Sequence, residues 1–418
     1  MIKDFRLKNF TLFREEELHL SPNLNVIIGE NGCGKSHLLK ALYSLVAVSA
    51  EQGRKAIDIS FETRMTSINN QLQFIKSEEF EKLNFEPPVP EVMMVDGFLE
   101  KTRSSFIHFF EKQREDLLKE IEVAINKPTK AFLEKSCAEK LNNVLRPEKL
   151  GNLASHHVIG DDGRRAELFI SNDDERTDIG ISFSPTSQSE VKVESLPQGW
   201  IREKPIFFPT RELLTLYPGF VSTYDNHYLE FEETYRDTCL LLGLPALKGD
   251  RELQAKALLK PIEEAMGGEI ILDSNGRFYL QQGKKRIEMP LVAEGLRKFA
   301  MLARLIATGP LLDKGYLFWD EPEANLNPKL IKTLAKVILD LCKQGIQVFI
   351  ATHSLFLLRE LEILQKGNDF ASLSTRYFGL NSMENGVKVE QGDEIYDLGQ
   401  IVVLDESLQQ SDRYLDME

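Results

Sequence analysis

The feature that most constrains this chain is a glycine-rich loop near its N-terminus. Residues Gly29–Ser36 have the sequence GENGCGKS, which satisfies the pattern GxxxxGK[ST]. A short apolar run, 25–28, precedes the loop, and apolar residues recur at helical spacing from Lys35 to about Ser49. The loop is therefore expected to join a buried strand to a helix, which is the context that a phosphate-binding loop requires.

Each part of this loop has a physical role in that interpretation. The glycines let backbone N–H groups curve around a phosphate, and the helix N-terminus adds the positive end of its dipole. Lys35 can reach the β- and γ-phosphate oxygens, and Ser36 can bind Mg²⁺. We therefore predict nucleotide binding by Gly29, Glu30, Asn31, Gly32, Cys33, Gly34, Lys35, Ser36 and His37.

A second group of candidate residues lies in the C-terminal half. The apolar run Tyr316–Trp319 is expected to form a buried strand, and it ends at Asp320 and Glu321. In an ATPase, an aspartate at this position holds the metal through water, and the next glutamate polarises the attacking water. Asp320 and Ser36 are thus the candidate metal residues, and Glu321 is the candidate catalytic base.

The longer run Asp320–Pro328, DEPEANLNP, resembles the Walker B and D-loop segment of ABC-type ATPases, in the soluble branch that includes SMC and RecF proteins. The resemblance implies that the nucleotide is ATP. It also implies a switch histidine that contacts the γ-phosphate, and His353 matches it in the run ATHS at the end of the next expected strand.

The family also has a signature motif, which opens a helix that meets the γ-phosphate held by a partner subunit. The run AEGLRK at 293–298 fits this position and makes Gly295 a candidate ATP-binding residue. Ala293 stands where the family has a serine, so a hydroxyl is missing and hydrolysis is expected to be slow. Arg211, at the place of the family's Q-loop, is a candidate nucleotide or interface contact, with a helix-capping turn as the alternative.

The resemblance implies an α/β fold: a P-loop NTPase of ABC-ATPase type with a mixed sheet, an antiparallel β subdomain and an inserted helical lobe. The expected halves of the ATPase lobe are 1–60 and 269–418, with 61–268 as the insertion. Within it we expect two helices between 98 and 145, separated at Pro128 and too short for an SMC-like coiled-coil arm. An antiparallel meander near 165–195 forms an inserted lobe, and a strand returns near 205–208.

Composition excludes several classes of protein. The chain has 418 residues, with 51 Lys and Arg against 65 Asp and Glu, and a net charge of −14 argues against a protein that coats nucleic acid. The four cysteines show no CxxC spacing, which argues against a structural zinc or a disulfide framework. We expect a cytoplasmic protein without a membrane segment, because no apolar run is long enough to span a bilayer.

Short chains with this Walker B run resemble the ATPases of bacterial antiviral operons, such as PARIS, Septu and AbiL-type systems. This resemblance implies a homodimer that sandwiches ATP, senses an intruder and controls a separate effector such as a nuclease. The alternative is a RecF-like repair ATPase that binds DNA directly. Its candidate basic surfaces are Lys284–Arg286 with Arg297–Lys298, and Lys101 with Arg103, although runs of this kind are more often solvated faces.

Overall fold

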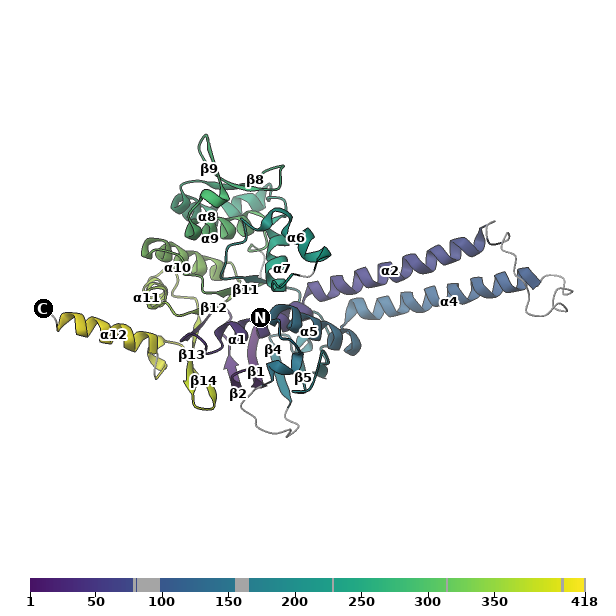
Figure 1. The fold of residues 1–418 in the computed structure, drawn as a ribbon, viewed down its shortest axis with the longest axis horizontal. Coiled ribbons are helices and arrows are strands. Elements are labelled where there is room, and N and C mark those ends of the chain that lie inside the picture. The colour runs from purple at the N-terminus through teal and green to yellow at the C-terminus, as the bar shows by residue number, and fades with distance from the viewer. Residues whose placement is uncertain are drawn as a thin grey trace.

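The fold is organised around an 11-stranded mixed β-sheet (Figure 1). The computed structural model describes residues 1–77, 80, 98–154, 165–227, 229–312, 315–399 and 402–416. Across the sheet the strands follow the order β6-β5-β4-β1-β2-β14-β13-β3-β12-β11-β7. The β13-to-β7 half is parallel, and the other half is mostly antiparallel. The predicted α/β class with a mixed sheet is confirmed.

The parallel half contains the strands whose sequences are most apolar. In spatial order they are β13 (Thr375–Met383), β3 (Leu24–Gly29), β12 (Gln347–Thr352), β11 (Gly315–Asp320) and β7 (Lys204–Phe208). Every neighbouring pair is parallel. Strands β3, β12 and β11 are buried at every residue, because helices cover both faces of the sheet. The carboxyl ends of these strands meet at one edge, where the expected site residues follow them.

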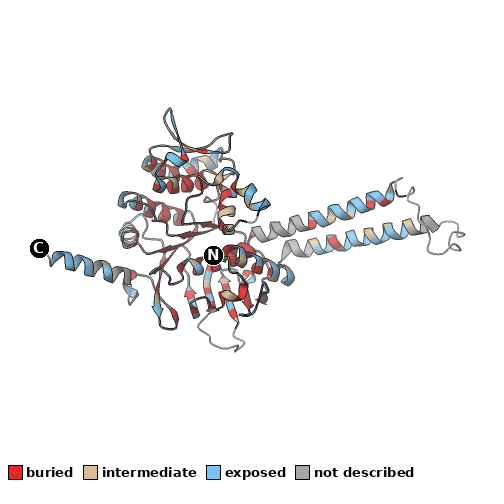
Figure 2. Ribbon diagram, viewed as in Figure 1, coloured by how far each residue is buried: buried red, intermediate tan, exposed pale blue. Residues whose placement is uncertain are grey.

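A hydrophobic core lies on each face of the sheet. Alternate residues of β3 face opposite sides, so Val26 and Ile28 belong to one core and Ile27 to the other. The core around Ile27 includes α1 (Lys35–Ser49) and α5 (Lys130–Leu145). The opposite core includes α6 (Tyr217–Asn226), α7 (Glu233–Leu242), α8 (Asp250–Met266), α9 (Glu294–Ala307), α10 (Pro328–Lys343) and α11 (Leu355–Gln365). Figure 2 shows the buried residues concentrated in these layers.

The antiparallel half continues the same sheet. Its strands are β14 (Gly386–Gly392), β2 (Phe13–His19), β1 (Ile2–Phe10), β4 (Ala166–Asn172), β5 (Ile179–Phe183) and β6 (Lys192–Ser195). The predicted meander near 165–195 exists, but the prediction that it forms an inserted lobe is wrong, because β4 pairs with β1 from Asn172↔Ile2 to Glu167↔Lys8. The sequence pattern marks the strands but does not show which free strand edge they join.

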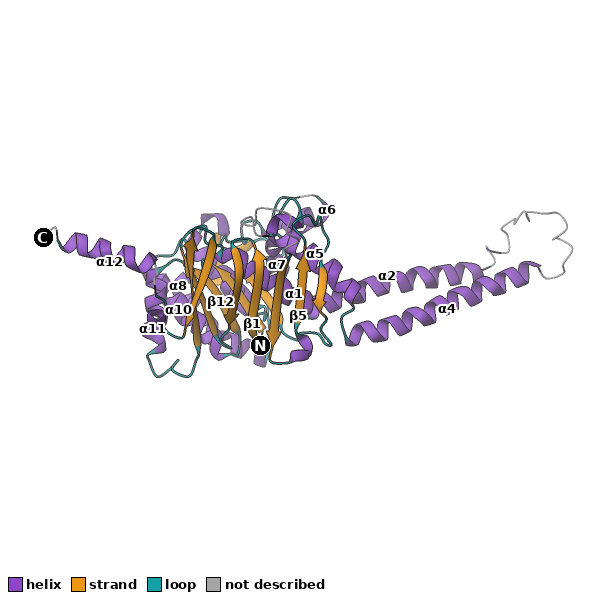
Figure 3. Ribbon diagram, turned by 90° about the horizontal axis from the view of Figure 1, so that it is seen from below, coloured by secondary structure: helices purple, strands orange, loops and turns teal. Residues whose placement is uncertain are grey.

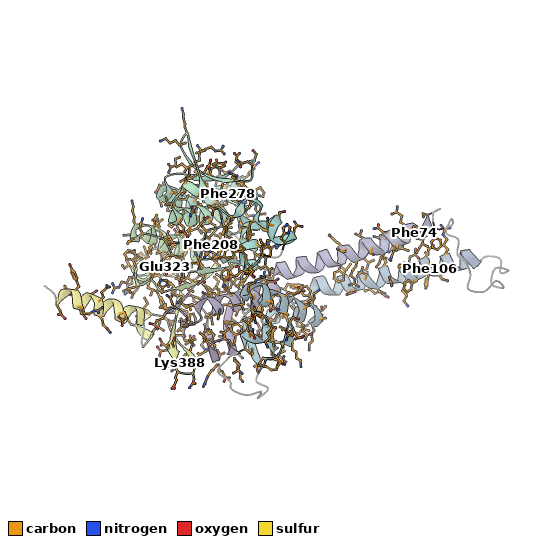
Figure 4. The ribbon with its side chains drawn as sticks, viewed as in Figure 1. Phe74, Phe106, Phe208, Phe278, Glu323 and Lys388 are labelled. Carbon is orange, nitrogen blue, oxygen red and sulfur yellow. The ribbon has the colours of Figure 1, made fainter. Side chains whose placement is uncertain are left out.

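Two long helices form an arm that projects from the body (Figures 1 and 3). They are α2 (Glu51–Lys76) and α4 (Phe98–Asn126), of 26 and 29 residues, so each is roughly 40 Å long. Ion pairs between the two helices include Arg64–Glu120 at 3.0 Å. Phe74 and Phe106 come from the two helices and lie near one end of the arm (Figure 4).

The presence of an arm differs from the expectation that the helices between 98 and 145 are too short to form one. The two helices expected between 98 and 145, and the break at Pro128, are confirmed by α4 and α5. Helix α2 was not expected, and the predicted boundary after residue 60 falls inside it. Helices α2 and α4 are separated by residues 77–97 in the chain, and it is their packing side by side that builds the arm.

The remaining elements are peripheral. A separate three-stranded antiparallel sheet consists of β8 (Glu269–Leu272), β9 (Phe278–Gln282) and β10 (Lys285–Glu288). Helix α12 (Val402–Leu415) projects on the side opposite the arm (Figure 3). Short 3-10 helices cover Leu150–Leu153, Glu175–Thr177, Met289–Leu291 and Ile395–Asp397. In the part of the chain that the structure describes, no helix combines the length and apolar character needed to cross a membrane.

Candidate nucleotide-binding site

The glycine-rich loop connects the carboxyl end of β3 to the start of α1, as predicted. Gly32 and Gly34 have φ values of +85° and +88°, a left-handed backbone that favours glycine. A Cβ at Gly34 would also lie 3.1 Å from the Phe13 ring. Left-handed residues in such a turn produce the concave main-chain surface that binds anions. The loop therefore has the backbone shape of a phosphate site.

Lys35 and Ser36 lie at the start of α1 and face the loop and β11. The Lys35 side chain is buried, and its Nζ donates to the carbonyl oxygens of Gly29 (2.8 Å) and Glu30 (2.7 Å). Ser36 Oγ donates to Asp320 Oδ2 at 2.7 Å. The structure thus joins two predicted site residues that are 284 positions apart in the chain.

Asp320 ends β11 in a position that suits a metal ion. Its side chain is buried, and this burial raises the pKa of the carboxyl, although the Ser36 hydrogen bond and nearby lysines oppose the shift. Oδ1 is buried without a hydrogen-bond partner. Buried carboxylate oxygens nearly always have a partner, and Mg²⁺ prefers oxygen ligands. Asp320 and Ser36 therefore fit the predicted Mg²⁺ site.

Glu321 has an unusual backbone conformation. Its φ is +46°, which is uncommon for a residue with a side chain. Its N–H donates to the Ala351 carbonyl on β12 at 2.9 Å, and Oε1 lies 3.3 Å from His353 Nδ1. The two predicted catalytic residues, Glu321 and His353, are therefore neighbours at adjacent strand ends. Strained backbone of this kind costs about 1–3 kcal/mol and is concentrated at functional sites.

Glu323 is a buried member of the same cluster to which the sequence analysis gave no role. Its Oε1 accepts a 2.6 Å hydrogen bond from Thr352 Oγ1 and lies 4.0 Å from His353 Nδ1, while Oε2 has no partner. Burial raises the pKa of this carboxyl. Figure 4 places Glu323 within the body, away from the arm. The DEPEA run contained the signal, because a third acid two residues after the first pair is unusual next to a buried strand.

The remaining loop residues divide into exposed and buried members. Glu30, Asn31 and His37 are exposed. Cys33 is fully buried, its Sγ donates to the Glu30 carbonyl at 2.9 Å, and burial raises the pKa of the thiol. The Cys33 side chain thus packs beneath the loop.

Gly295 lies on the first turn of α9, with Ala293 as an N-cap that makes no side-chain cap hydrogen bond. A Cβ at Gly295 would lie 2.5 Å from the Asn325 carbonyl oxygen, so only glycine fits at this close approach. The structure places Gly295 against the loop that follows Glu321 rather than against Gly29–Ser36. A groove of about 880 Å³ borders this turn and is lined by Ala293, Gly295, Leu296, Asn325, Asn327 and other residues.

The segment after β7 contributes Glu212 rather than Arg211 to the interior. Arg211 is exposed, whereas Glu212 is buried, accepts a 2.6 Å hydrogen bond from Thr215 Oγ1 and pairs with Arg297 at 3.0 Å. Helix α6 begins at Tyr217, and its N-cap Leu216 makes no side-chain cap hydrogen bond, so the helix-capping alternative is not confirmed here. The nucleotide contact predicted for Arg211 stays a prediction.

The structure overturns part of the predicted basic surface. Lys298 is 1% exposed, and Arg297 is largely buried in its pair with Glu212, so neither can form a solvent-facing DNA contact. Arg103 donates to the carbonyls of Ile75 and Lys76 at the end of α2. The side chain of Lys101 lies outside the described residues. Basic residues that repeat on a helix can face inward as well as outward, which sequence alone does not distinguish.

Segments of the chain are similar to known proteins. Short segments match curated relatives named "DNA replication and repair protein RecF", with 54% identity over 44 residues in Chlamydia abortus (10% of this chain, 12% of the relative) and 39% over 85 residues in Chlamydia caviae (20% of each). An "ATP/GTP phosphatase" of Helicobacter pylori is 38% identical over 77 residues (18% of this chain, 21% of the relative). The chain thus spans about a fifth or less of the length of these relatives.

Among solved structures, the SMC head domain from Thermotoga maritima has a TM-score of 0.41 at 12% identity, covering 93% of this chain and 98% of that chain. An SMC head domain from Pyrococcus furiosus, bound to the C-terminal domain of ScpA, has a TM-score of 0.43 at 10% identity and covers 99% of each chain.

One family model matches most of the chain. It spans residues 24–359, from β3 before the glycine-rich loop to α11 after His353, and is described as "AAA domain, putative AbiEii toxin, Type IV TA system". The match includes Lys35, Gly295, Asp320 and Glu321. The resemblance to ABC-type ATPases of the SMC and RecF branch is confirmed, and the chain belongs to the AAA_21 family of AAA-domain proteins.

Proposed function

We propose that this protein binds ATP with Mg²⁺ and hydrolyses it slowly. The observation that carries the proposal is the 2.7 Å contact between Ser36 Oγ and Asp320 Oδ2, beside the partnerless Asp320 Oδ1. Together they offer hard oxygen ligands next to a loop shaped for phosphate. When bound, Mg²⁺ neutralises charge on the phosphates. Lys35, at the same loop, would bind the β- and γ-phosphate oxygens.

Glu321 is the proposed general base. It lies directly after Asp320, and its carboxylate is beside His353, so a water near the γ-phosphate would meet both side chains. Glu321 would take a proton from that water, and His353 would contact the γ-phosphate. The missing hydroxyl at Ala293 supports slow turnover, because the signature turn then has only main-chain N–H groups for the phosphate.

The proposed quaternary state is a homodimer that sandwiches two ATP molecules. In it, Gly295 of each copy faces the γ-phosphate held by the other copy. The position of Gly295 supports this arrangement: it lies on the first turn of α9, beside a groove, and the positive end of the helix dipole is suited to a phosphate. ATP binding would close the dimer and hydrolysis would reopen it.

We propose that this cycle controls a separate effector, such as a nuclease, in a cytoplasmic antiviral system of bacteria. The description of the matched family names a toxin–antitoxin system, which also couples one protein to the activity of another. A second candidate is a RecF-like role on DNA, favoured by the matches to RecF proteins. Of its predicted basic surfaces, Lys284, Lys285 and Arg286 are exposed, and Arg286 pairs with Asp273 at 3.4 Å.

Phosphate release tests the enzymatic proposal. The purified chain with ATP and Mg²⁺ should release phosphate, and EDTA should stop the release. With Glu321→Gln and ATP, light scattering should show a dimer. A chain that binds no ATP would contradict the whole proposal, and a monomer in the last experiment would contradict the sandwich.

DNA binding measured against salt separates the two roles. Affinity that falls steeply as salt increases indicates direct phosphate contacts and favours the RecF-like role. Binding that is absent at low salt favours control of a separate effector.

A further inference from the structure

Lys298 on α9 is an unusual residue for its position. Its side chain is 1% exposed, and lysine is rarely so buried unless it has a partner. Its Nζ donates to the main-chain carbonyl oxygen of Glu321 at 3.1 Å. A buried ammonium on the helix that carries the signature glycine therefore bonds directly to the proposed general base.

The surroundings of Lys298 explain how the charge is kept in the interior. Burial lowers the pKa of the ammonium to about 8, and the nearby acids Glu323, Glu321, Glu294 and Asp320 oppose this shift. The hydrogen bond nevertheless goes to a main-chain oxygen. The lysine thus holds the backbone of the acidic cluster while its charge offsets part of the negative charge there.

The Glu321 peptide is held from several directions. Its N–H donates to the Ala351 carbonyl on β12 at 2.9 Å, and its carbonyl accepts from Ala324 N–H at 3.1 Å as well as from Lys298. The left-handed φ of +46° is costly for glutamate, so contacts of this kind are needed to maintain it. Of these contacts, the one from Lys298 comes from the signature helix.

We propose that Lys298 is a positioning residue for ATP hydrolysis. It fixes the Glu321 peptide, keeps the carboxylate beside His353, and ties the position of α9 to the position of the base. Because Gly295 lies one turn before Lys298 on the same helix, a shift of α9 when a partner's phosphate docks would move the Glu321 carbonyl. This inference rests on the proposed ATPase function and adds a residue to its machinery.

The test is Lys298→Met, which removes the ammonium but keeps a long side chain. We expect kcat for ATP to fall about 10- to 100-fold, while the Kd for ATP changes less than about threefold, because the loop residues are untouched. Lys256→Met is the matched control: Lys256 is an exposed lysine on α8 that pairs with Glu252, and kcat should not change. A folded Lys298→Met with wild-type kcat, or a parallel loss of Kd and kcat, would overturn the proposal.

A double-mutant cycle shows whether Lys298 acts through Glu321. In a Glu321→Gln background, Lys298→Met should cause little further loss of kcat, since the group it positions is already disabled. An additive loss would contradict positioning of Glu321. If wild type itself does not hydrolyse ATP, the proposed function fails instead, so the two failures are distinguishable.

If Lys298→Met does not fold, Lys298→Gln tests the positioning role of Lys298 instead. The glutamine amide is neutral and one bond shorter than lysine, so its hydrogen bond to Glu321 is weakened and not simply removed. We expect kcat to fall about threefold or more with an unchanged Kd for ATP. A folded Lys298→Gln with wild-type kcat would overturn the proposal.

Discussion

The two halves of the sheet differ in how far their strands are buried, and only the parallel half carries the candidate site. Strands β3, β11 and β12 are buried at every residue, whereas β1 and β2 alternate buried with exposed residues. In the parallel half, β3, β11 and β12 all end at one edge, and the loop glycines, Asp320 and His353 follow them. In the antiparallel half, successive strands end at opposite edges, and their polar groups pair locally, as Arg165 does with Ser182. Parallel connection therefore gathers distant polar residues, whereas antiparallel connection disperses them.

Left-handed backbone and buried polar atoms without a hydrogen-bond partner occur in both halves of the sheet. In the antiparallel half, Asn9 and Thr11 have φ values of +49° and +46°, and Thr11 Oγ1 and Asn172 Oδ1 are buried without a partner. Gly32, Gly34 and Glu321, all left-handed, lie at the carboxyl edge of the parallel half. Asp320 and Glu323 each keep one buried oxygen without a partner there. At the parallel edge these features surround the strand ends that carry Asp320 and Glu321, where a ligand can use them. Substituting the acids at this edge should therefore change turnover more than stability, and breaking a buried ion pair elsewhere should do the reverse.

The largest expected effect is on turnover at the parallel edge. Glu321→Gln should lower kcat about 10²- to 10⁴-fold, because the amide cannot accept the proton from water, while ATP binding is retained. Steady-state phosphate release and equilibrium binding of ATP measure the two quantities. The control is Glu15→Gln on β2, an exposed carboxylate of the antiparallel half, which should leave kcat unchanged. Equal kcat in wild type and Glu321→Gln would contradict the assignment of Glu321 as the general base, and the parallel edge would then differ from the antiparallel half in no effect on turnover.

The next effect concerns stability at a buried ion-pair cluster between α5 and α7. Lys140 on α5 is buried and bonds Glu233 (2.9 Å) and Asp237 (2.7 Å) of α7. Lys140→Met removes the buried cation from both acids, leaving Asp237 a 3.7 Å ion pair with Arg236, and should lower the free energy of unfolding by about 3 kcal/mol. Denaturant unfolding checks the loss. Once folded at low temperature, the variant should keep kcat within about threefold of wild type. A much larger loss of kcat would contradict the prediction that this cluster contributes to stability and not to turnover.

A third substitution tests the phosphate loop. Lys35→Ala removes a charged donor and should weaken ATP binding about 10- to 100-fold. Titration calorimetry with ATP and Mg²⁺ provides the measurement. Lys8→Ala, at an exposed lysine of β1, is the control from the antiparallel half. ATP affinity that is the same in Lys35→Ala and wild type would contradict the loop assignment.

The smallest expected effect lies where the two halves touch. Gly34→Ala puts a Cβ on a residue with φ of +88° and 3.1 Å from Phe13 of β2, so it should cost about 1–2 kcal/mol of stability. Gly199→Ala, with no heavy atom within 4 Å of the new Cβ, should be close to neutral. Thermal unfolding of the two variants compares them. If Gly34→Ala melted at the same temperature as Gly199→Ala, the loop would have adapted to the added methyl group.

Much of the candidate site was predictable because its residues follow strands in the chain. The glycine-rich loop, Lys35, Ser36, Asp320, Glu321 and His353 each stand next to an apolar run that marks a buried strand. Glu212 and Lys298 were not predictable in this way. Their roles depend on contacts across 85 and 23 residues, to Arg297 and to the Glu321 carbonyl, and no local pattern distinguishes these buried charges from solvent-facing ones.

The same division holds for the fold. Apolar runs, glycines and Pro128 were enough to place four strands of the parallel half, β3, β7, β11 and β12, together with the loop and the helices α4 and α5, since these depend on local propensity and periodicity. Strand β13 was not predicted. Tertiary structure alone decided that β4 joins β1, that α2 pairs with α4 in an arm, and that Lys298 faces inward. Strand pairing and helix docking depend on which buried surfaces fit together, and that choice is made between segments far apart in the chain.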